Sequence, residues 1–268
     1  MSPAMHNAAF QQLGLDYAYL AFRVEKAQLG AAVAGIRALG FAGANVTIPY
    51  KIDVMKHLDE VDSLAKQIGA VNTIVNDDGR LIGHNTDGEG ALKALESAGV
   101  VLSGKRVVML GAGGAARSIA FTLAKKAKPK SISILNIARM DAEELAKRVK
   151  AHATTSVKGL ALNEQNLEAE IGSADVLINA TSVGMSPKAG ESLVPKALFR
   201  KGLAVFDIVY NPLETKLIRE AQSAGCVTVT GEKMLANQGA ASFELWTGKK
   251  APAKTMLAVI RKGLGARD

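Results

Sequence analysis

The sequence predicts an α/β protein with two domains, an N-terminal α/β substrate domain and a Rossmann-like, doubly wound dinucleotide-binding domain. The buried-strand run Lys105–Leu110 leads directly into the glycine-rich segment Gly111–Ser118, and a helical pattern follows, which is the order of a dinucleotide-binding unit. Strand and helix patterns alternate on both sides of this unit over 268 residues, a length that suits two ordinary domains. We therefore expect residues 1–87 and 233–268 to form the substrate-binding and catalytic domain, and residues 88–232 the dinucleotide-binding domain.

The first domain is expected to alternate helices with short strands. Apolar residues at helical spacing indicate helices at Pro3–Gly14 and about Lys26–Leu39, with another helix after Lys51. Asp77-Asp78-Gly79 is expected to form a hairpin turn. The strands predicted from β-branched and aromatic runs are Tyr17–Phe22, Gly43–Thr47, Ala70–Asn76 and Arg80–Asn85.

The second domain is expected to begin with a helix over Gly88–Ala98, with Asp87 as its cap or close to the cap. The helix after the glycine-rich segment is expected to run to about Ala127. Further strands with helices between them predict a doubly wound parallel sheet. These strands are Ser131–Leu135, Asp175–Asn179, Ala204–Asp207 and Val227–Val229, and the helices are Ala142–Ala151 and Thr215–Ala224.

The glycine-rich segment has the G-x-G-x-x-A form of the dinucleotide fingerprint at Gly111, Gly113 and Ala116. The pattern provides a tight turn, room for a pyrophosphate and close helix packing, and backbone N–H groups at the helix start would bind the phosphates. Alone, such a pattern also fits an ordinary glycine-rich turn, but here it lies between a strand and a helix. The expected phosphate-binding residues are Gly111, Ala112, Gly113, Gly114, Ala115 and Ala116.

Two polar motifs of the first domain supply a lysine and an aspartate: Lys51 ends the run NVTIPYK (45–51), and Asp87 lies in GHNTDG (83–88). A lysine ammonium ordinarily titrates near pH ~10.4, so proton exchange near neutral pH requires surroundings that disfavour the charge. Pro49 favours the first turn of a helix, whose dipole disfavours positive charge at its start. A nearby aspartate would orient the ammonium and accept a substrate hydroxyl. For either residue alone, a surface lysine and a turn aspartate remain the alternative.

Composition and charge exclude several classes of protein. The net charge of +8 is distributed over amphipathic helices, which indicates solvated surfaces and steering of an anionic substrate or cofactor rather than binding of nucleic acid. No apolar run is long enough for a membrane span, and no secretory signal begins the chain. The single cysteine, Cys226, fits a reducing cytoplasm. The four histidines lack metal-site spacing, so we predict no metal.

These and other motifs resemble, in order and spacing, those of the shikimate dehydrogenase family. The first domain contributes NVTIPYK (45–51), GAVNT (69–73) and NTDG (85–88). The resemblance continues with SPAMHNAAF (2–10), NATSVGM (179–185), Gln238 and LWTG (245–248), so it covers nearly the whole chain. It implies that the segment from about Met234 returns to the first domain and that the site lies in the cleft between the domains.

The resemblance implies reversible hydride transfer between a nicotinamide cofactor and the C3 oxygen-bearing carbon of shikimate or 3-dehydroshikimate, a step of aromatic amino-acid biosynthesis, by a monomer or homodimer. Lys51 and Asp87 would be the catalytic pair that supplies or accepts the proton, and Asn72 and Asp87 would bind ring hydroxyls. Tyr210 matches a cleft tyrosine of the family, although it also fits a turn beside Asn211-Pro212. The other implied substrate contacts are Ser2 (to the carboxylate), Asn45, Thr47 and Gln238, and the other implied cofactor contacts are Asn136, Arg139, Thr181, Ser182, Val209 and Gly231.

The N-terminus departs from the family pattern. Met1 falls between the two serines of the family's H-S-x-S-P segment, so the family's opening strand and first serine have no counterpart in this sequence. The expectation is an internal methionine taken as the start, or a truncated gene. Loss of that strand would expose a strand edge.

The predicted cofactor loop is a second departure. Asn136 is followed by Ile137-Ala138-Arg139, where NADP-dependent members usually have Asn-Arg-Thr. NAD-dependent relatives usually have an acidic residue at the strand end, and Asn136 is not acidic, although it can bond a ribose diol. Arg139 can reach a 2′-phosphate from the loop, whereas Asp141 would oppose it. The cofactor is therefore NAD or NADP, with a slight preference for NAD.

Three rival functions remain from the sequence. The first is an NAD-dependent quinate/shikimate dehydrogenase or a related enzyme of a catabolic pathway. The second is a truncated protein that binds the cofactor without turnover, in which case NAD(P) would raise thermal stability without any reaction. The third, an amino-acid-dehydrogenase-like or tetrahydrofolate-linked enzyme of similar plan, is disfavoured by the NVTIPYK run.

Overall fold

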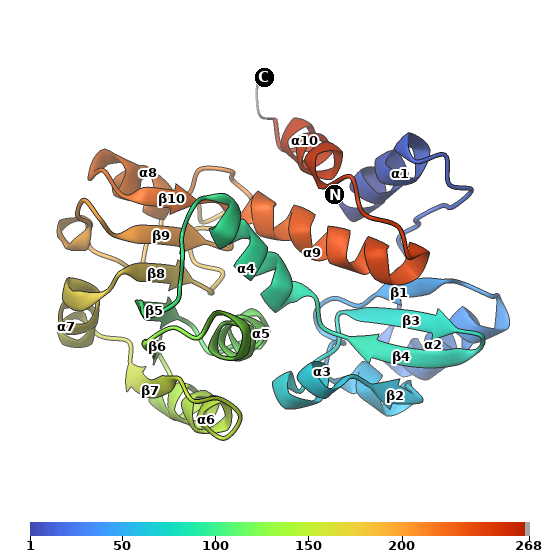
Figure 1. Ribbon diagram of the computed structural model, residues 1–268, viewed down its shortest axis with the longest axis horizontal. Helices are drawn as coiled ribbons and strands as arrows, with labels where there is room; N and C mark the ends of the chain where they lie inside the picture. Colours follow the sequence, from blue (N-terminus) through green and yellow to red (C-terminus); the bar gives the residue numbers. More distant parts are fainter. Residues whose placement is uncertain (266–268) are drawn as a thin grey trace.

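The computed structural model describes residues 1–265 and confirms the two-part α/β architecture. One part contains a four-stranded sheet of order β1-β3-β4-β2, and the other a six-stranded sheet of order β10-β9-β8-β5-β6-β7. Figure 1 shows the two sheets on opposite sides of the molecule, with the helices α4 (Asp87–Ser97) and α9 (Gly231–Thr247) between them. Side chains in the region between the two sheets are therefore close to α4 and α9.

The smaller sheet is mostly antiparallel. β1 (Gly43–Asn45) and β4 (Arg80–His84) both pair antiparallel with β3 (Thr73–Asp77), whereas β2 (Glu60–Val61) pairs parallel with β4. The predicted turn at Asp77-Asp78-Gly79 is confirmed, because Asp78 and Gly79 have φ values of 47° and 90°, as a tight hairpin turn requires. The helices beside this sheet are α2 (Leu29–Ala38) and α3 (Ser63–Ile68), with 3₁₀ turns at Lys26–Gln28 and Asp53–His57. The sequence did not predict β2 or α3.

The strand predicted at Tyr17–Phe22 is wrong. The backbone N–H and C=O of Tyr19 bond instead to the side chain of Asn7, at 2.7 and 3.0 Å. Within residues 1–265 no strand pairs with this segment, and Leu20 and Phe22 are 65% and 66% exposed. A pattern of β-branched and aromatic residues forms a strand only where a neighbouring strand accepts its hydrogen bonds.

The helix predicted after Lys51 is also largely wrong. Lys51 lies in a turn, and the helical segment that follows is the five-residue 3₁₀ turn Asp53–His57. So short a segment aligns few peptide dipoles, so the helix dipole does not explain how a lysine here would exchange protons. The surroundings of the Lys51 ammonium are therefore described by its ion pair and hydrogen bonds and not by a helix dipole.

The larger sheet is entirely parallel and covered on both faces, which confirms the doubly wound plan. Successive residues of β5 (Arg106–Leu110) contribute to different cores: Val107 and Met109 pack with α4, α5 and α6, whereas Val108 and Leu110 pack with α7 and α8, because side chains alternate across a strand. The other strands are β6 (Ser131–Asn136), β7 (Ser156–Ala161), β8 (Val176–Asn179), β9 (Ala204–Asp207) and β10 (Val227–Val229), and the helices are α5 (Gly114–Thr122, continued as a π-helical turn to Ala127), α6 (Arg139–Lys150), α7 (Glu164–Ser173) and α8 (Lys216–Ser223). β7 and α7 were not predicted.

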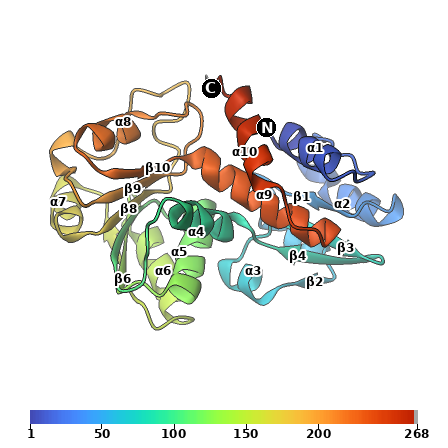
Figure 2. The same cartoon turned by 45° about the horizontal axis from the view of Figure 1, so that its top comes forward.

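The C-terminal helices return to the first part of the chain. Met5 and Phe10 of α1 (Ser2–Gln12), Phe243 of α9, and Met256 and Ile260 of α10 (Ala253–Gly263) belong to one buried cluster. Figure 2 shows α1 and α10 beside α9, which extends from the larger sheet to the smaller one. α9 therefore contributes side chains to the region between the sheets.

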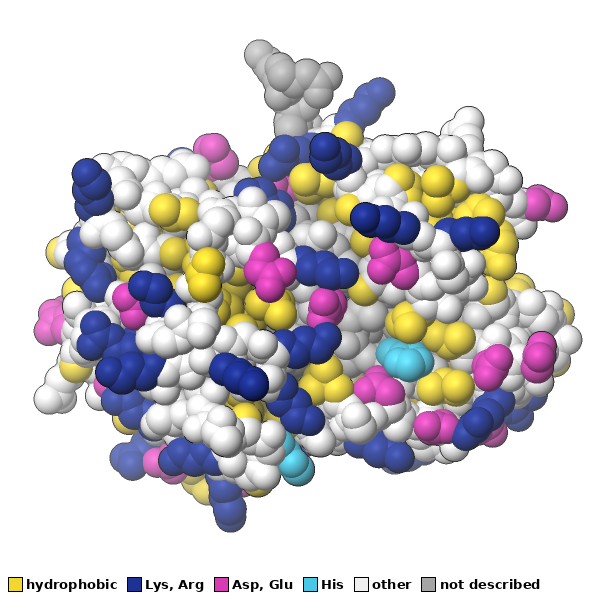
Figure 3. Space-filling model, viewed as in Figure 1, with side chains coloured by type: hydrophobic (Ala, Val, Ile, Leu, Met, Phe, Trp, Pro, Cys, Tyr) yellow, Lys and Arg dark blue, Asp and Glu magenta, His cyan; other side chains and the backbone are white. Residues whose placement is uncertain are grey.

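The surface shows charge of both signs. Figure 3 shows Lys and Arg side chains over both halves of one face, with Asp and Glu among them. In the part of the chain that the structure describes, no helix is both long and apolar enough to cross a membrane. The same residues contain no group of three or more His, Cys, Asp or Glu side chains suited to a metal ion.

Candidate active site

Lys51 and Asp87 form an ion pair between the two sheets. The Lys51 Nζ lies 2.6 Å from the Asp87 Oδ2, and their side chains are 23% and 10% exposed. Asp87 is the first residue of α4, where the positive end of the helix dipole favours its negative charge. The cap itself is Thr86, and no side-chain cap bond is made. The carboxylate is therefore available to the lysine and to polar neighbours.

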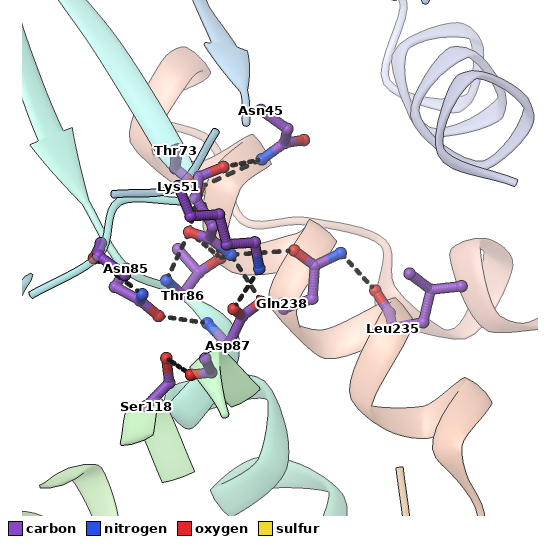
Figure 4. A network of polar contacts seen from close by, with 12 residues as sticks. Asn45, Lys51, Thr73, Asn85, Thr86, Asp87, Ser118, Leu235 and Gln238 are labelled. Atoms are coloured by element: carbon purple, nitrogen blue, oxygen red, sulfur yellow. Dashed lines mark hydrogen bonds and ion pairs between the residues drawn. The ribbon is translucent and has the colours of Figure 1, made fainter. Parts of the chain in front are cut away.

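Asn72 fixes the other side of this carboxylate. Its Nδ2 donates to the Asp87 Oδ1 at 2.8 Å and to the Thr86 Oγ1 at 3.0 Å, while its Oδ1 accepts from the Thr86 backbone N–H at 2.8 Å. The Asn72 side chain is almost fully buried, so these bonds determine which way its amide faces. The Lys51 ammonium thus meets a carboxylate held in one orientation (Figure 4).

Helix α9 closes this polar network from a distant part of the chain. The Gln238 Oε1 lies 3.5 Å from the Asn72 Nδ2, and the Gln238 Nε2 donates to the Leu235 carbonyl oxygen at 3.1 Å. The hydroxyl of Ser242, one turn further along α9, lies 2.8 Å from the Thr73 Oγ1. Figure 4 shows Gln238 facing the Lys51–Asp87 pair from α9. The structure therefore brings Gln238 together with Asn72 and the ion pair.

A second branch of the network runs through Asn45 towards the N-terminal helix. The Asn45 Nδ2 donates to the Asn72 carbonyl oxygen and to the Ser242 Oγ, both at 3.1 Å. The Tyr19 hydroxyl donates to the Asn45 Oδ1 at 3.0 Å. Burial raises the pKa of Tyr19, and the neighbouring Ser2 side chain opposes this shift. Ser2 and Asn45 thus lie at one end of the network, linked by Tyr19.

Two predicted substrate residues lie outside this network. Thr47 is exposed, and Tyr210 is 38% exposed. Among the side-chain hydrogen bonds of residues 1–265, none joins Thr47 or Tyr210 to the network. The network residues that were not predicted as site residues include Tyr19, Thr73, Thr86 and Ser242, of which Thr73 lies inside the GAVNT motif. Thr86 lies inside the NTDG motif, but only the fold shows that Tyr19 and Ser242 are near it.

The glycine turn at the carboxyl end of β5 fits a dinucleotide pyrophosphate. Gly111 has φ +103°, and a Cβ there would lie 2.9 Å from the Thr181 Cγ2. Gly113 is the N-cap of α5, and Cβ atoms at Gly113 or Gly114 would meet nothing within 4 Å. The first backbone N–H groups of α5 therefore border open space, which suits phosphate binding at a helix start. Of the remaining turn residues, Ala116 is buried and packs the helix onto the sheet.

Asn136 and Arg139 lie at the end of β6, the neighbouring strand. The Asn136 Nδ2 donates to the Ala138 carbonyl oxygen at 3.1 Å and lies 3.5 Å from the Asp141 Oδ2. The Arg139 Nε bonds the Glu143 Oε1 at 2.7 Å, and both side chains are exposed. Ile137 between them is 82% exposed. Within residues 136–141, all of which the structure describes, Arg139 is the one cation, and it is paired with the acid Glu143.

The other predicted cofactor residues follow the ends of β8, β9 and β10. The Thr181 N–H and hydroxyl both donate to the Asn179 Oδ1, at 3.2 and 2.7 Å. Ser182 follows in the same loop, where its carbonyl oxygen accepts from the Met185 N–H. Val209 is buried, and a Cβ on Gly231 would lie 2.6 Å from the Val209 carbonyl oxygen. All four residues thus border the edge of the sheet that carries the glycine turn.

The fold and this site define a class of two-domain, dinucleotide-dependent oxidoreductases. Comparison with known proteins makes the assignment specific: the models described as "Shikimate dehydrogenase substrate binding domain", "Shikimate / quinate 5-dehydrogenase" and "Shikimate 5'-dehydrogenase C-terminal domain" match residues 1–74, 92–217 and 231–261. The chain belongs to the shikimate dehydrogenase family and is an oxidoreductase of that type, which confirms the resemblance seen in its motifs.

Individual relatives match over almost the full chain. It is 48% identical to the shikimate dehydrogenase (NADP(+)) of Moorella thermoacetica, over 99% of this chain and 90% of that one. It is 49% identical to the enzyme of the same name from Pyrococcus abyssi, over 99% and 94%. The crystal structure of shikimate 5-dehydrogenase from Listeria monocytogenes in complex with shikimate and NAD is 40% identical, with a TM-score of 0.92 over 97% of this chain and 91% of that one.

Proposed function

We propose that this chain catalyses the reversible oxidation of shikimate to 3-dehydroshikimate with NADP or NAD, using Lys51 and Asp87 as its catalytic pair. The observation that carries the proposal is the 2.6 Å contact between the Lys51 Nζ and the Asp87 Oδ2 (Figure 4). Asp87 begins α4, and the next residue, Gly88, packs against α5, the helix that follows the glycine turn. Residues 1–87 and 233–268 would bind the substrate, and residues 88–232 the cofactor. The relatives named as shikimate dehydrogenases support the substrate.

The roles of the side chains follow from their positions. A bound nicotinamide cofactor would supply or accept the hydride at the substrate carbon. Lys51 would bind the oxygen on that carbon and transfer its proton, and Asp87 would orient the ammonium and accept a bond from a neighbouring hydroxyl. Asn72 holds the Asp87 carboxylate in place and, with Gln238, would contact ring hydroxyls. Ser2 and Asn45 would bind the carboxylate end of the substrate, with Thr47 and Tyr210 completing the site from its rim.

The sequence-based preference for NAD is not supported, because the relatives from Moorella thermoacetica and Pyrococcus abyssi are named as NADP(+) enzymes. We propose instead that the enzyme uses both NADP and NAD and that Arg139 binds the 2′-phosphate of NADP. An exposed ion pair such as Arg139–Glu143 contributes only about 0–1 kcal/mol, so the guanidinium can leave Glu143 at little cost. Asn136 would bond the ribose, while Gly111–Ala116, Thr181, Ser182, Val209 and Gly231 would surround the rest of the cofactor.

Quinate is the alternative substrate, because the matching model of residues 92–217 is described for shikimate and quinate together. The deciding experiment measures oxidation of shikimate and of quinate by the full chain, with NADP and NAD separately, from the absorbance of the reduced cofactor. Shikimate turnover with a kcat/KM well above that for quinate supports the proposal. Preference for quinate, or cofactor binding without turnover of either acid, would overturn it.

A further inference from the structure

A buried carboxyl group at the end of β9 connects the two loops that border the dinucleotide-binding turn. Asp207 is fully buried. Its Oδ1 accepts from the Asn179 Nδ2 at 2.9 Å and the Val209 N–H at 3.1 Å, and its Oδ2 accepts from the Thr215 hydroxyl at 2.6 Å. No ion pair of Asp207 occurs within residues 1–265. Burial raises the pKa of Asp207 to about 6, although the three hydrogen bonds act to lower it. Keeping this carboxylate charged inside the protein therefore costs folding free energy.

The hydrogen bonds of Asp207 extend into the loop after β8. Asn179, the last residue of β8, receives both bonds from Thr181 at its Oδ1, and the Thr181 Oγ1 in turn accepts from the Val183 N–H at 3.1 Å. Because Asp207 binds the Nδ2 of the same amide, it determines which way that amide faces. A reversed Asn179 amide would lose the bonds to Thr181.

The same carboxyl group shapes the loop after β9 and the start of α8. It binds the Val209 N–H directly, and Thr215 both donates to it and caps α8 by accepting from the Ile218 N–H at 3.3 Å. Thr181 lies in the first of the two loops that Asp207 joins, and Val209 lies in the second. Both residues lie against glycines of the dinucleotide edge: Thr181 beside Gly111, and Val209 beside Gly231.

The position of these loops indicates which half of the cofactor they face. The strand order places β6 on one side of β5, and β8 and β9 on the other. A dinucleotide at such an edge places its pyrophosphate on the glycine turn and its adenine ribose at the end of the next strand, here β6 with Asn136. The nicotinamide half then extends over the ends of β8 and β9.

We propose that Asp207 is a positioning residue that holds the loops after β8 and β9 in the arrangement that binds the nicotinamide half of the cofactor. It acts through Asn179 and Val209 and does not itself contact the cofactor. This inference rests on the proposed function only in requiring that the site take a nicotinamide dinucleotide.

The test compares two ligands that differ only in the nicotinamide ring, NADP and ADP-ribose 2′-phosphate, by calorimetric titration of the full chain. Asp207→Ala is expected to weaken NADP binding at least tenfold while changing the affinity for ADP-ribose 2′-phosphate less than twofold. Asp207→Asn, which keeps an acceptor for Asn179 and Val209, is expected to restore most of the NADP affinity. Equal weakening of both ligands, or unchanged NADP binding, would overturn the proposal.

A second pair of variants covers the case in which Asp207→Ala does not fold. Thr215→Val removes the hydroxyl bond to Asp207 while keeping nearly the same side-chain shape. It is expected to weaken the binding of NADP, but not of ADP-ribose 2′-phosphate, by about threefold or more. Thr215→Ser keeps the hydroxyl bond and is expected to keep the NADP affinity. Identical binding by the two Thr215 variants would count against the role of Asp207. If the wild type binds NADP but does not oxidise shikimate, the proposed function fails while the comparison of the two ligands still decides the role of Asp207.

Discussion

At the scale of single residues, the site is built from short polar contacts whose orientations are fixed by burial. The Lys51–Asp87 contact of 2.6 Å and the Asn72–Asp87 contact of 2.8 Å leave the carboxylate little freedom. Lys51, Asp87, Asn72 and Gln238 were all selected from sequence motifs, and they meet in one network. Sequence alone did not find Tyr19 or Ser242, because their hydroxyls reach the network only through tertiary packing.

On the proposed function, cofactor preference would depend on the exposed ion pair between Arg139 and Glu143. Arg139→Ala is expected to lower kcat/KM with NADP by roughly ten- to a hundredfold, since a charged hydrogen bond contributes about 1.5–3 kcal/mol, and to leave the value with NAD unchanged. Glu143→Gln frees the guanidinium and is expected to act in the opposite direction, raising the preference for NADP. Steady-state kinetics with both cofactors measures both effects. An equal loss with NAD and NADP would show that Arg139 does not bind the 2′-phosphate.

His6 is expected to make the protein sensitive to acid. Its ring is fully buried and stacks on Tyr19 at 4.6 Å, and among residues 1–265 neither of its nitrogens has a hydrogen-bond partner. Burial lowers the pKa of His6 from 6.5 to about 4. The folded state therefore favours the neutral ring, so the stabilisation is complete above pH 6.5 and is lost as the pH falls towards 4.

The resulting loss in the free energy of unfolding is about 3 kcal/mol between these two pH values. Asp207, whose pKa is raised to about 6, acts in the opposite sense: its contribution is complete below pH 3.8 and is lost as the pH rises through 6. The two effects are separated by comparing denaturation of the wild type with His6→Phe, which is expected to lose the acid-dependent contribution of His6. The exposed His57 provides the control variant His57→Gln. A constant difference between wild type and His6→Phe from pH 4 to 7 would contradict this account.

At the scale of elements, the crossing of α4 and α9 places Asp87 and Gln238 opposite each other. The crossing is close because α4 has Gly90 at the contact: a Cβ there would lie 2.8 Å from the Gln238 Cβ and from the Met234 carbonyl oxygen. The sequence predicted α4 and five of the six strands of the larger sheet, since their hydrophobic patterns are strong, but it did not predict β7. The predictions of a strand at Tyr17–Phe22 and of a helix after Lys51 were wrong. In both segments the local residue pattern does not determine which groups the backbone can hydrogen-bond in the folded chain.

Substitution of Gly90 tests the importance of this crossing. Gly90→Ala is expected to lower the free energy of unfolding by about 1–3 kcal/mol, because the added methyl group overpacks the contact. Gly35→Ala in α2 is the matched control: its Cβ would meet nothing within 4 Å, so it is expected to raise stability by roughly 0.4–1 kcal/mol. Chemical denaturation of both variants measures the difference. Equal effects of the two substitutions would show that the helices do not pack as closely as described.

At the scale of the whole molecule, function depends on two sheets meeting around α4 and α9. The two-domain plan was predictable from the glycine fingerprint and the order of the patterns. The composition of the site was not fully predictable, because Asn45, Asp87 and Gln238 come from a strand, a helix start and a distant C-terminal helix. Only the packing of α9 against α4 brings them together, and no spacing along the chain encodes that contact.

Lys51 is proposed to act on the substrate oxygen beside a bound nicotinamide cofactor. The most direct measurement compares shikimate oxidation by the full wild-type chain and by Lys51→Met, which keeps an unbranched side chain of similar length without the charge, while cofactor affinity is measured by calorimetry. Loss of the proton-transferring group is expected to lower kcat by about 10²–10⁴-fold, with cofactor affinity within twofold of the wild type. Turnover by Lys51→Met within tenfold of the wild type, at equal cofactor affinity, would contradict the claim.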